Sequence, residues 1–234
     1  MTVGLYKFGW NSDVDAAEDI WDGGGDYTFP AAAAATTVVS ASTADDTGEA
    51  GAITLSVQGL DSNYLMVTED ATLNGTSAVT LTNQFLRVFR MKVETAGASG
   101  ANVGAITCAH GATTIAQIGA TYGQTLMAVY TIPADYSHAV WGTWEASVTN
   151  FQVSTAATLA FQARPFGGAW NTKAVIGINS DGGPFLKTFR RTSNFEWSLG
   201  DDIFVAKTDI RVRVLAVTKT NMGIASGFEL GLKP

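Results

Sequence analysis

The sequence is poor in the residues that most often build metal and nucleophile sites. Its 234 residues include one cysteine, Cys108, and two histidines, His110 and His138. A single cysteine excludes an intramolecular disulfide, so stability must come from an apolar core or from oligomerisation. Cys108 and His110 share one face of a strand, but no second Cys or His cluster supplies the remaining ligands of a metal site. We therefore expect no cofactor, no bound metal and no catalytic residue.

Charged residues are also scarce, at 15% of the chain against 46% hydrophobic residues and 25 glycines. This balance is typical of an all-β protein. A surface so poor in charge is expected where neighbouring subunits cover much of it, although monomeric β proteins can have the same composition. The net charge of -7 argues against nucleic acid as a partner, because phosphate binding depends on Lys and Arg.

The chain has neither a signal-peptide pattern at its start nor an apolar stretch of roughly 20 residues. We accordingly expect a chain made in the cytoplasm, with no membrane partner. Its charge is uneven: residues 1–120 contain 13 acids and 4 bases, whereas residues 121–234 contain 8 acids and 10 bases. The two halves thus carry net charges of opposite sign.

Short apolar alternations separated by turn signals about every ten residues predict the fold. Residues 52–59 alternate cleanly, and residues 158–163 end at the turn sequence Arg-Pro-Phe-Gly-Gly. In the long strand 138–148, Trp141 and Trp144 are three residues apart, which predicts that they point to opposite faces. We predict an antiparallel β-sandwich or jelly roll, with lobes at residues 31–120 and 121–234 or one composite sandwich.

Residues 1–30 differ from the rest and predict an acidic, aromatic arm without a clear strand. Ser12 or Asp13 could cap one short helix that ends at residues 23–25, and deletion of residues 1–29 is expected to leave a folded sandwich. The arm should dock on a basic surface of its own C-terminal lobe, of a neighbouring subunit or of another protein. The candidate assembly contacts are acidic and aromatic residues of this arm, together with two arginines of the C-terminal lobe that share a strand face. They are Trp10, Asp13, Asp15, Asp19, Trp21, Asp22, Tyr27, Phe29, Arg211 and Arg213.

Several segments together resemble a family of structural proteins in tailed bacteriophages, notably those of aquatic bacteria. The resemblance lies in KFGWNSDVDAAEDIWDGGGDYTFP, GLDSNYLMVTEDATLNGTSAV, FLRVFRMKVETAGASGANVGAIT, GQTLMAVYTIPA, RPFGG and KTDIRVR, and it covers nearly the whole chain. One departure is Asp135, where glycine is expected in such sequences. The resemblance implies a virion protein and transfers no catalytic residue.

The resemblance leaves the place in the virion open. Our first expectation is a capsid decoration or cement protein that forms a homotrimer and binds the major capsid protein on the shell surface. The alternative is a tail, fibre or host-recognition protein with a surface glycan as a possible partner. A glycan-cleaving enzyme is a third class, in which Glu145 or Glu196 would pair with an aspartate, but a sequence gives no carboxylate separation.

Overall fold

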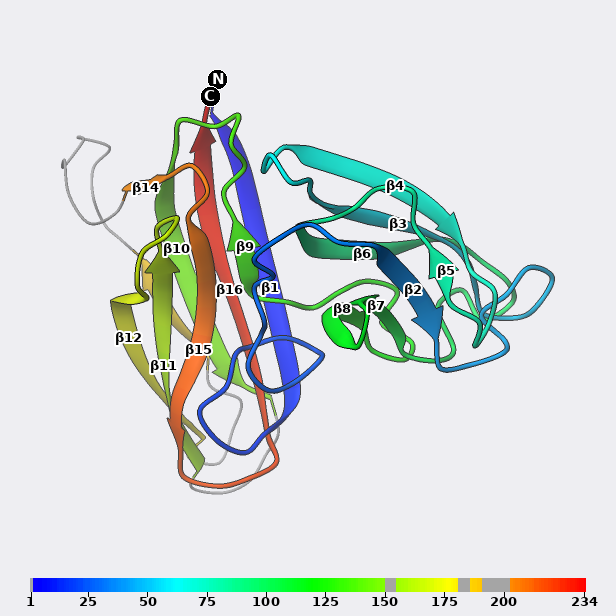
Figure 1. Cartoon of the computed structure of the whole chain (residues 1–234). Coiled ribbons are helices and arrows are strands. Elements are labelled where there is room, and N and C mark those ends of the chain that lie inside the picture. The colour runs from blue at the N-terminus through cyan, green and yellow to red at the C-terminus, as the bar shows by residue number, and fades with distance from the viewer. Residues whose placement is uncertain (1, 150–154, 181–185, 191–202) are drawn as a thin grey trace. The chain divides into compact units, whose positions relative to one another are not determined.

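The computed structural model describes residues 2–149, 155–180, 186–190 and 203–234, in which strands occur and no helix does (Figure 1). The strands form antiparallel sheets, so the all-β prediction is confirmed. With no helix in the described ranges, none is present that is long and apolar enough to cross a membrane. The chain divides into two compact units, which we call the terminal unit (residues 1–26 and 128–234) and the inserted unit (residues 27–127).

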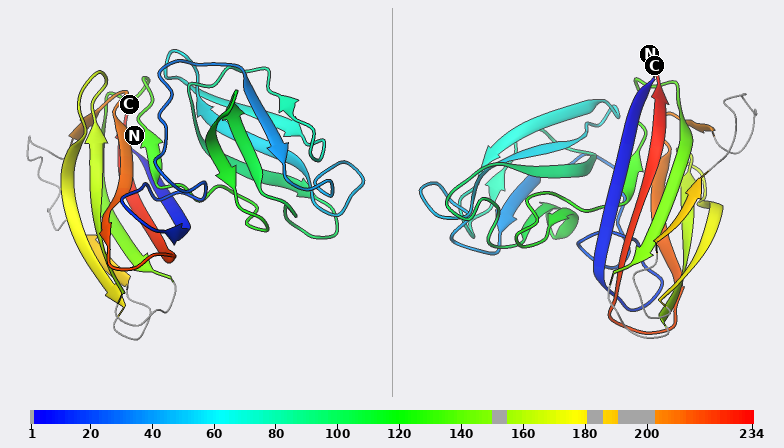
Figure 2. Two further views of the ribbon diagram at one scale, coloured as in Figure 1. Left: turned by 60° about the horizontal axis from the view of Figure 1, so that its bottom comes forward. Right: turned by 180° about the vertical axis from the view of Figure 1, so that it is seen from behind.

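The terminal unit is built from two antiparallel sheets that face each other (Figures 1 and 2). The first sheet has the order β1-β16-β10, and both β13 and β14 pair with β10. The second has the order β12-β11-β15-β9. The bounds are β1 Val3–Val14, β9 Val129–Thr131, β10 His138–Val148, β11 Thr155–Arg164, β12 Asn171–Ser180, β13 Leu186–Arg190, β14 Ile203–Val205, β15 Asp209–Val217 and β16 Met222–Lys233.

An aromatic cluster fills the space between these two sheets. Phe161 on β11 is fully buried and stacks on Trp141 of β10, with ring centroids 4.3 Å apart and an interplanar angle of 3°. Trp144 and Phe228 also contact Phe161, at centroid distances of 6.0 and 5.3 Å. The predicted opposite orientation of the two tryptophans is wrong, because a bulge places one extra residue on β10 between Trp141 and Trp144 where it pairs with β16. Both rings therefore enter the same core.

The start of the chain is also corrected by the structure. Residues 3–14 form strand β1, which runs antiparallel to β16 from Val3 opposite Leu232 to Val14 opposite Met222. The expected helix and strandless arm are therefore wrong for this segment, and deletion of residues 1–29 would remove an edge strand from the sheet. The residues of β1 that face inward include Lys7, Gly9 and Asn11, so the inner face lacks the apolar alternation by which strands are recognised.

At Gly9, the inner face of β1 has no room for a side chain. A Cβ at Gly9 would lie 2.3 Å from the backbone nitrogen of Ala128 and 2.5 Å from the carbonyl oxygen of Ile20. The backbone of the terminal unit thus closes over β1 at a distance that only glycine permits. The two units divide after Asp26 and after Met127, so residues 1–26 share a unit with residues 128–234.

The inserted unit contains two further antiparallel sheets, with the orders β5-β2-β7-β8 and β4-β3-β6. Its core includes the fully buried side chains of Leu55, Phe85, Met91, Ile106 and Ile115. The alternation in residues 52–59 corresponds to β3, where Leu55 and Val57 are buried. The bounds are β2 Thr36–Ser40, β3 Ala52–Leu60, β4 Met66–Thr72, β5 Val79–Thr80, β6 Arg87–Ala96, β7 Ile106–His110 and β8 Thr113–Ile118.

A buried carboxylate, Asp45, organises the loops at one end of the inserted unit. Its Oδ1 accepts hydrogen bonds from the backbone nitrogens of Ala52 and Val103, both at 2.8 Å. Its Oδ2 accepts hydrogen bonds from the Ser40 hydroxyl at 2.5 Å and the Gly104 nitrogen at 2.9 Å. Burial acts to raise the pKa of Asp45, but these four donors outweigh it and hold the pKa below its usual value.

We expect Asp45→Asn to destabilise the inserted unit by about 1–3 kcal/mol, because the new amide group cannot accept hydrogen bonds from donors on that side. Because the pKa of Asp45 is lower in the folded state, its ionised carboxylate stabilises the inserted unit, and this stabilisation is fully present above the unfolded-state pKa of about 3.9. That contribution is lost as the pH falls through the lower folded-state pKa. Denaturant unfolding at neutral and at acid pH would measure the free energy of unfolding of both proteins. The difference between wild type and variant should become smaller as the pH is lowered.

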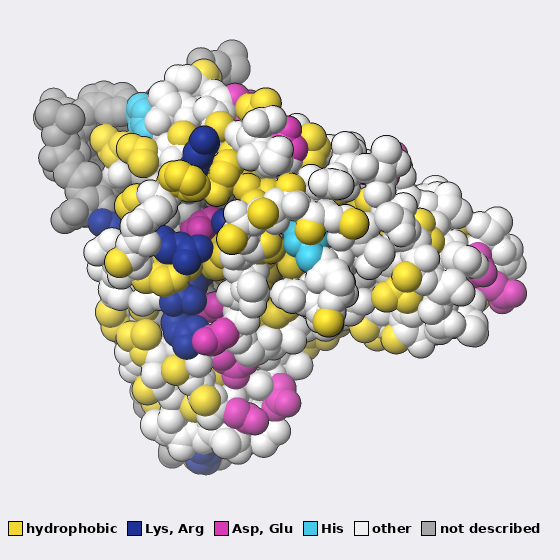
Figure 3. Space-filling model, viewed as in Figure 1, with side chains coloured by type: hydrophobic (Ala, Val, Ile, Leu, Met, Phe, Trp, Pro, Cys, Tyr) yellow, Lys and Arg dark blue, Asp and Glu magenta, His cyan; other side chains and the backbone are white. Residues whose placement is uncertain are grey.

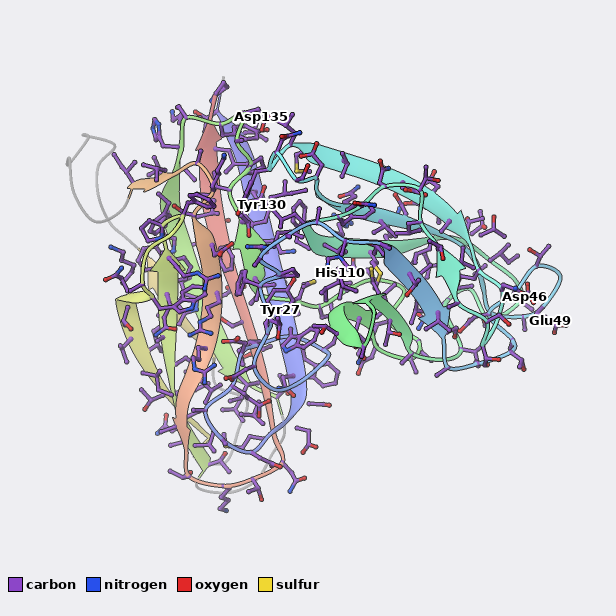
Figure 4. All side chains as sticks on the ribbon, viewed as in Figure 1. Tyr27, Asp46, Glu49, His110, Tyr130 and Asp135 are labelled. Atoms are coloured by element: carbon purple, nitrogen blue, oxygen red, sulfur yellow. The ribbon has the colours of Figure 1, made fainter. Side chains whose placement is uncertain are left out.

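The matched control is Glu49→Gln in the same loop, where Glu49 is exposed (Figure 4). This change should alter the free energy of unfolding by less than about 0.5 kcal/mol. A wild-type stability advantage over Asp45→Asn that stays constant down to pH values far below 4 would contradict the role given to the ionised carboxylate.

Candidate assembly surface

The segment after β1 is attached to the edge of β15 within the terminal unit. Backbone hydrogen bonds join the Ile20 nitrogen to the Val212 oxygen at 3.0 Å and the Val214 nitrogen to the Glu18 oxygen at 2.8 Å. The Glu18 carboxylate ties this segment together by accepting from the Gly25 nitrogen at 2.6 Å. These contacts place Asp19 and Asp26 beside the arginines of β15.

Asp19 lies fully buried between the two arginines that were predicted to share a strand face. Its carboxylate oxygens are 3.3 Å from the Nη1 atoms of Arg211 and of Arg213. Arg213 Nη1 is also 2.6 Å from Asp26, and its Nη2 donates to the Ala17 carbonyl at 3.0 Å. Figure 3 shows a column of Lys and Arg side chains on this face with acidic side chains beside it.

The pKa values of the two guanidinium groups are shifted in opposite directions. Burial acts to lower the pKa of both groups. At Arg211 burial prevails over the charge of Asp19, and the pKa lies below its usual value. At Arg213 the hydrogen bond with Asp26 and the charge of Asp19 prevail, and the pKa is raised. Of the residues predicted as assembly contacts, Asp19, Arg211 and Arg213 lie together in the structure, joined by these ion pairs.

The other predicted acids and tryptophans of the terminal unit are placed separately. Trp21 is buried and donates from its indole nitrogen to the Gly25 carbonyl at 3.1 Å. Asp15 accepts from the Asn221 nitrogen at 2.7 Å, Asp13 is exposed and Asp22 is half-buried. Trp10 lies on β1 and is described further below.

Tyr27 and Phe29 belong to the inserted unit and lie edge to face, with ring centroids 4.7 Å apart. Tyr27, which Figure 4 labels, is buried. The Arg87 guanidinium lies over the Phe29 ring, 5.5 Å from its centroid. Both of these ring contacts lie within the inserted unit.

Cys108 and His110 lie on β7 of the inserted unit. Cys108 is fully buried, and burial raises the pKa of its thiol to about 12. Burial also lowers the pKa of the nearby His110, which Figure 4 labels. No group of three or more His, Cys, Asp or Glu side chains that could hold a metal ion occurs within the described ranges. Glu196, one of the two candidates for a carboxylate pair, lies outside the described residues.

The sequence analysis missed an aromatic ring that lies among cations on the outer face of the second sheet. The guanidinium carbons of Arg164 and Arg211 lie over the Trp170 ring, at 4.7 and 4.1 Å from its centroid. Asp209 anchors Arg164 through a 2.6 Å ion pair, and Gln162 accepts from Arg211 Nε at 3.0 Å. The spacing of these residues along the sequence does not reveal the stack, because it joins β11, β15 and the loop before β12.

Phe166 lies in the turn between β11 and β12, in the same connection as Trp170. The turn closes with a 2.8 Å hydrogen bond from the Gly168 nitrogen to the Pro165 oxygen, and Gly167 has a φ of 71°. The Phe166 side chain is 67% exposed, and the Lys207 ammonium lies 5.6 Å from its ring centroid. We call Arg164, Phe166, Trp170, Lys207 and Arg211 the arginine–aromatic surface.

Comparisons with known proteins add little to this geometry. No family model and no curated protein matches the chain. Among solved structures, a subviral particle of VP2 from infectious bursal disease virus matches at 10% identity and a TM-score of 0.20, over 99% of this chain and 72% of that one. The structure of the Gx strain of the same virus matches at 12% identity and a TM-score of 0.20, over 100% of this chain and 82% of the other. Likenesses this low carry no argument about fold or function, so the site must be argued from its own residues.

Proposed function

We propose that this chain is a non-enzymatic structural protein of a virus particle, which decorates and stabilises the head shell of a tailed phage. The observation that carries the proposal is the exposed Phe166 ring in the same connection between β11 and β12 as the arginine-bound Trp170. Aromatic residues and arginine are enriched in protein interfaces and dominate their binding energy. The resemblance of the sequence to tailed-phage structural proteins supports this kind of particle.

The chemistry of the surface indicates the kind of partner. Arg164, Arg211 and Lys207 are cationic, so an acidic patch with an apolar pocket on the major capsid protein would match them. The ion pairs with Asp19 and Asp209 fix the two arginines in place and reduce the entropy that binding must overcome. A homotrimer on the virion surface would repeat this contact with the symmetry of the shell.

The alternative is a tail, fibre or host-recognition protein, and the copy number separates it from the first proposal. A decoration protein occurs in numbers that match the symmetric shell lattice, whereas a tail part occurs in far fewer copies. Quantitative mass spectrometry of purified virions, with the major capsid protein as the internal reference, measures this ratio. A ratio of only a few copies per particle would exclude the decoration role.

We expect Phe166→Ala to weaken binding to the shell at least about tenfold, because truncating an aromatic hot spot removes its buried contact. Co-sedimentation of the purified chain with undecorated shells of the phage that encodes it would measure the affinity. The control is Leu65→Ala, which removes an exposed apolar side chain from the inserted unit. Equal binding by both variants and the wild type would contradict the role of the arginine–aromatic surface.

A further inference from the structure

The outer face of the first sheet carries a row of aromatic rings that the proposed function does not use. Tyr6, Phe8 and Trp10 occupy alternate positions of β1, so their side chains share one face. Tyr6 is 51% and Phe8 39% exposed, and Trp10 is half-buried. The rise along a strand spaces the Cα atoms of successive residues in this row by about 7 Å. We call these three residues the aromatic platform.

The rings of Tyr6 and Trp10 are tied down across the sheet. The Tyr6 hydroxyl donates to Glu145 Oε1 at 2.5 Å, and Glu145 lies on β10, with β16 between it and β1. Because adjacent strands are about 4.8 Å apart, the Tyr6 side chain must lie along the sheet to make this bond. The Trp10 indole reaches in the same direction and donates to the Thr149 hydroxyl, just beyond β10, at 3.0 Å.

The strand beneath the platform has small residues where the rings cross it. Phe8 is opposite Gly227 and Trp10 is opposite Ala225 in the register of β1 with β16. A Cβ at Gly227 would lie 2.4 Å from the Tyr6 hydroxyl oxygen and 2.9 Å from the adjacent ring carbon. Glycine at this position therefore lets the tyrosine ring rest on the backbone and keep one face toward solvent.

Two carboxylates lie near the platform and give this face a negative charge. Glu145 and Glu229 lie on the same outer face, and the Thr143 hydroxyl donates to Glu229 at 2.7 Å. Burial, the bond to Glu145 and the charges of both glutamates raise the pKa of Tyr6. The Tyr6 hydroxyl consequently stays protonated at neutral pH and keeps the ring in its position.

Three kinds of ligand bind exposed aromatic side chains: a partner protein, a single-stranded nucleic acid and a sugar. The orientation of the rings and the charge around them favour one of the three. Aromatic anchors of protein interfaces enter pockets of the partner, whereas the rings of Tyr6 and Trp10 lie along the sheet with their polar tips already bonded. Single-stranded nucleic acid stacks on such rings but needs cations along its backbone, and Glu145 and Glu229 would repel its phosphates. A sugar ring has an apolar C–H face for stacking and hydroxyl groups that can donate to carboxylates.

We propose that the aromatic platform binds an uncharged polysaccharide, whose successive sugar rings stack on Tyr6, Phe8 and Trp10 while their hydroxyl groups bond to Glu145 and Glu229. The even spacing of these three residues along β1 suits a repeating ligand. Prior fixation of the tyrosine and tryptophan lowers the entropy lost on binding. This proposal does not depend on a role in the head shell.

Affinity electrophoresis of the full-length chain tests the proposal. Native gels containing hydroxyethylcellulose, laminarin, dextran or glycol chitin supply uncharged polymers, and an alginate gel supplies an anionic one. We expect retardation by at least one uncharged polymer and none by alginate. Tyr6→Ala and Trp10→Ala should each weaken the retardation at least about tenfold, comparable to the loss of one stacked ring. Phe166→Ala, which removes an exposed aromatic ring from the turn between β11 and β12, should leave the retardation unchanged.

Further variants keep the test valid if an alanine variant misfolds. Tyr6→Phe retains the ring and loses the bond to Glu145, so it should bind more weakly than wild type and more tightly than Tyr6→Ala. Gly227→Val should displace the Tyr6 ring and weaken binding without altering Tyr6 itself. Circular dichroism and thermal unfolding would establish that each variant is folded.

Three outcomes would overturn the proposal. The first is a wild-type chain that none of the four uncharged polymers retards. The second is retardation that survives in both Tyr6→Ala and Trp10→Ala. The third is sedimentation showing a wild-type oligomer that these two substitutions dissociate, which would assign the platform to contact between copies of the chain.

Discussion

Phe161→Ala is expected to lower the free energy of unfolding of the terminal unit by about 3–5 kcal/mol, the range measured for truncating buried aromatic residues. Phe161 is fully buried and contacts Trp141, Trp144 and Phe228 from the opposite sheet. Truncation would leave a cavity, because these large rings belong to a rigid sheet and cannot collapse into the space. It would also remove the stacked contact with Trp141, which contributes beyond the buried area.

Chemical denaturation followed by tryptophan fluorescence would measure this loss, since Trp141 and Trp144 report directly on the core. Phe166→Ala is the matched control, because it removes the same side chain from an exposed turn five residues further along. The control should change the free energy of unfolding by less than about 0.5 kcal/mol. Similar losses in the two variants would show that the sheets do not pack through Phe161.

Asp19→Ala is expected to destabilise the terminal unit by about 3–5 kcal/mol, as found when one partner of a buried ion pair is removed. The reason is that Arg211 and Arg213, whose side chains are only 14% and 17% exposed, would lose the buried carboxylate between them. Arg213 would retain Asp26, whereas Arg211 would retain only the neutral Gln162 and the Trp170 ring among the contacts described above.

Two comparisons isolate the buried charge. Asp26→Ala removes a carboxylate that is 66% exposed in the same cluster, and it should cost no more than about 1 kcal/mol. The triple change Asp19→Leu, Arg211→Met and Arg213→Met removes all three charges, and it should be less destabilising than Asp19→Ala alone. A triple variant that is less stable than Asp19→Ala would mean that the ion pairs themselves, and not the stranded arginines, account for the effect.

The start of the chain shows where sequence patterns fail. On most strands of this protein the inward side chains are apolar, and Leu55 and Val57 on β3 were found by that rule. On β1 the inward positions include Lys7, Gly9 and Asn11, and the aromatic residues face outward. The reversed pattern led to the prediction of an arm. Only the pairing with β16, more than 200 residues away, makes residues 3–14 a strand.

The candidate sites were predictable to different degrees. The opposite charges of residues 13–26 and of β15 could be read as complementary, and the structure joins them through Asp19, Arg211 and Arg213. The Arg164–Trp170–Arg211 stack and the platform of Tyr6, Phe8 and Trp10 could not be predicted. The stack joins side chains from three separate segments. The platform lies on β1 alone, but its rings are held through Glu145 of β10 and Gly227 of β16, and only the assembled sheet defines the registers of those strands.

By itself, the sequence determined that this protein is all-β, because composition and local alternation act within each strand and turn and require no partner. It also led to the expectation of no metal site, because no second Cys or His cluster accompanies Cys108 and His110. Tertiary structure alone decided that both ends of the chain share one sheet, that a bulge turns Trp141 and Trp144 to one side, and that Gly227 supports the ring of Tyr6. These features depend on strand register, which long-range packing sets and no local pattern encodes.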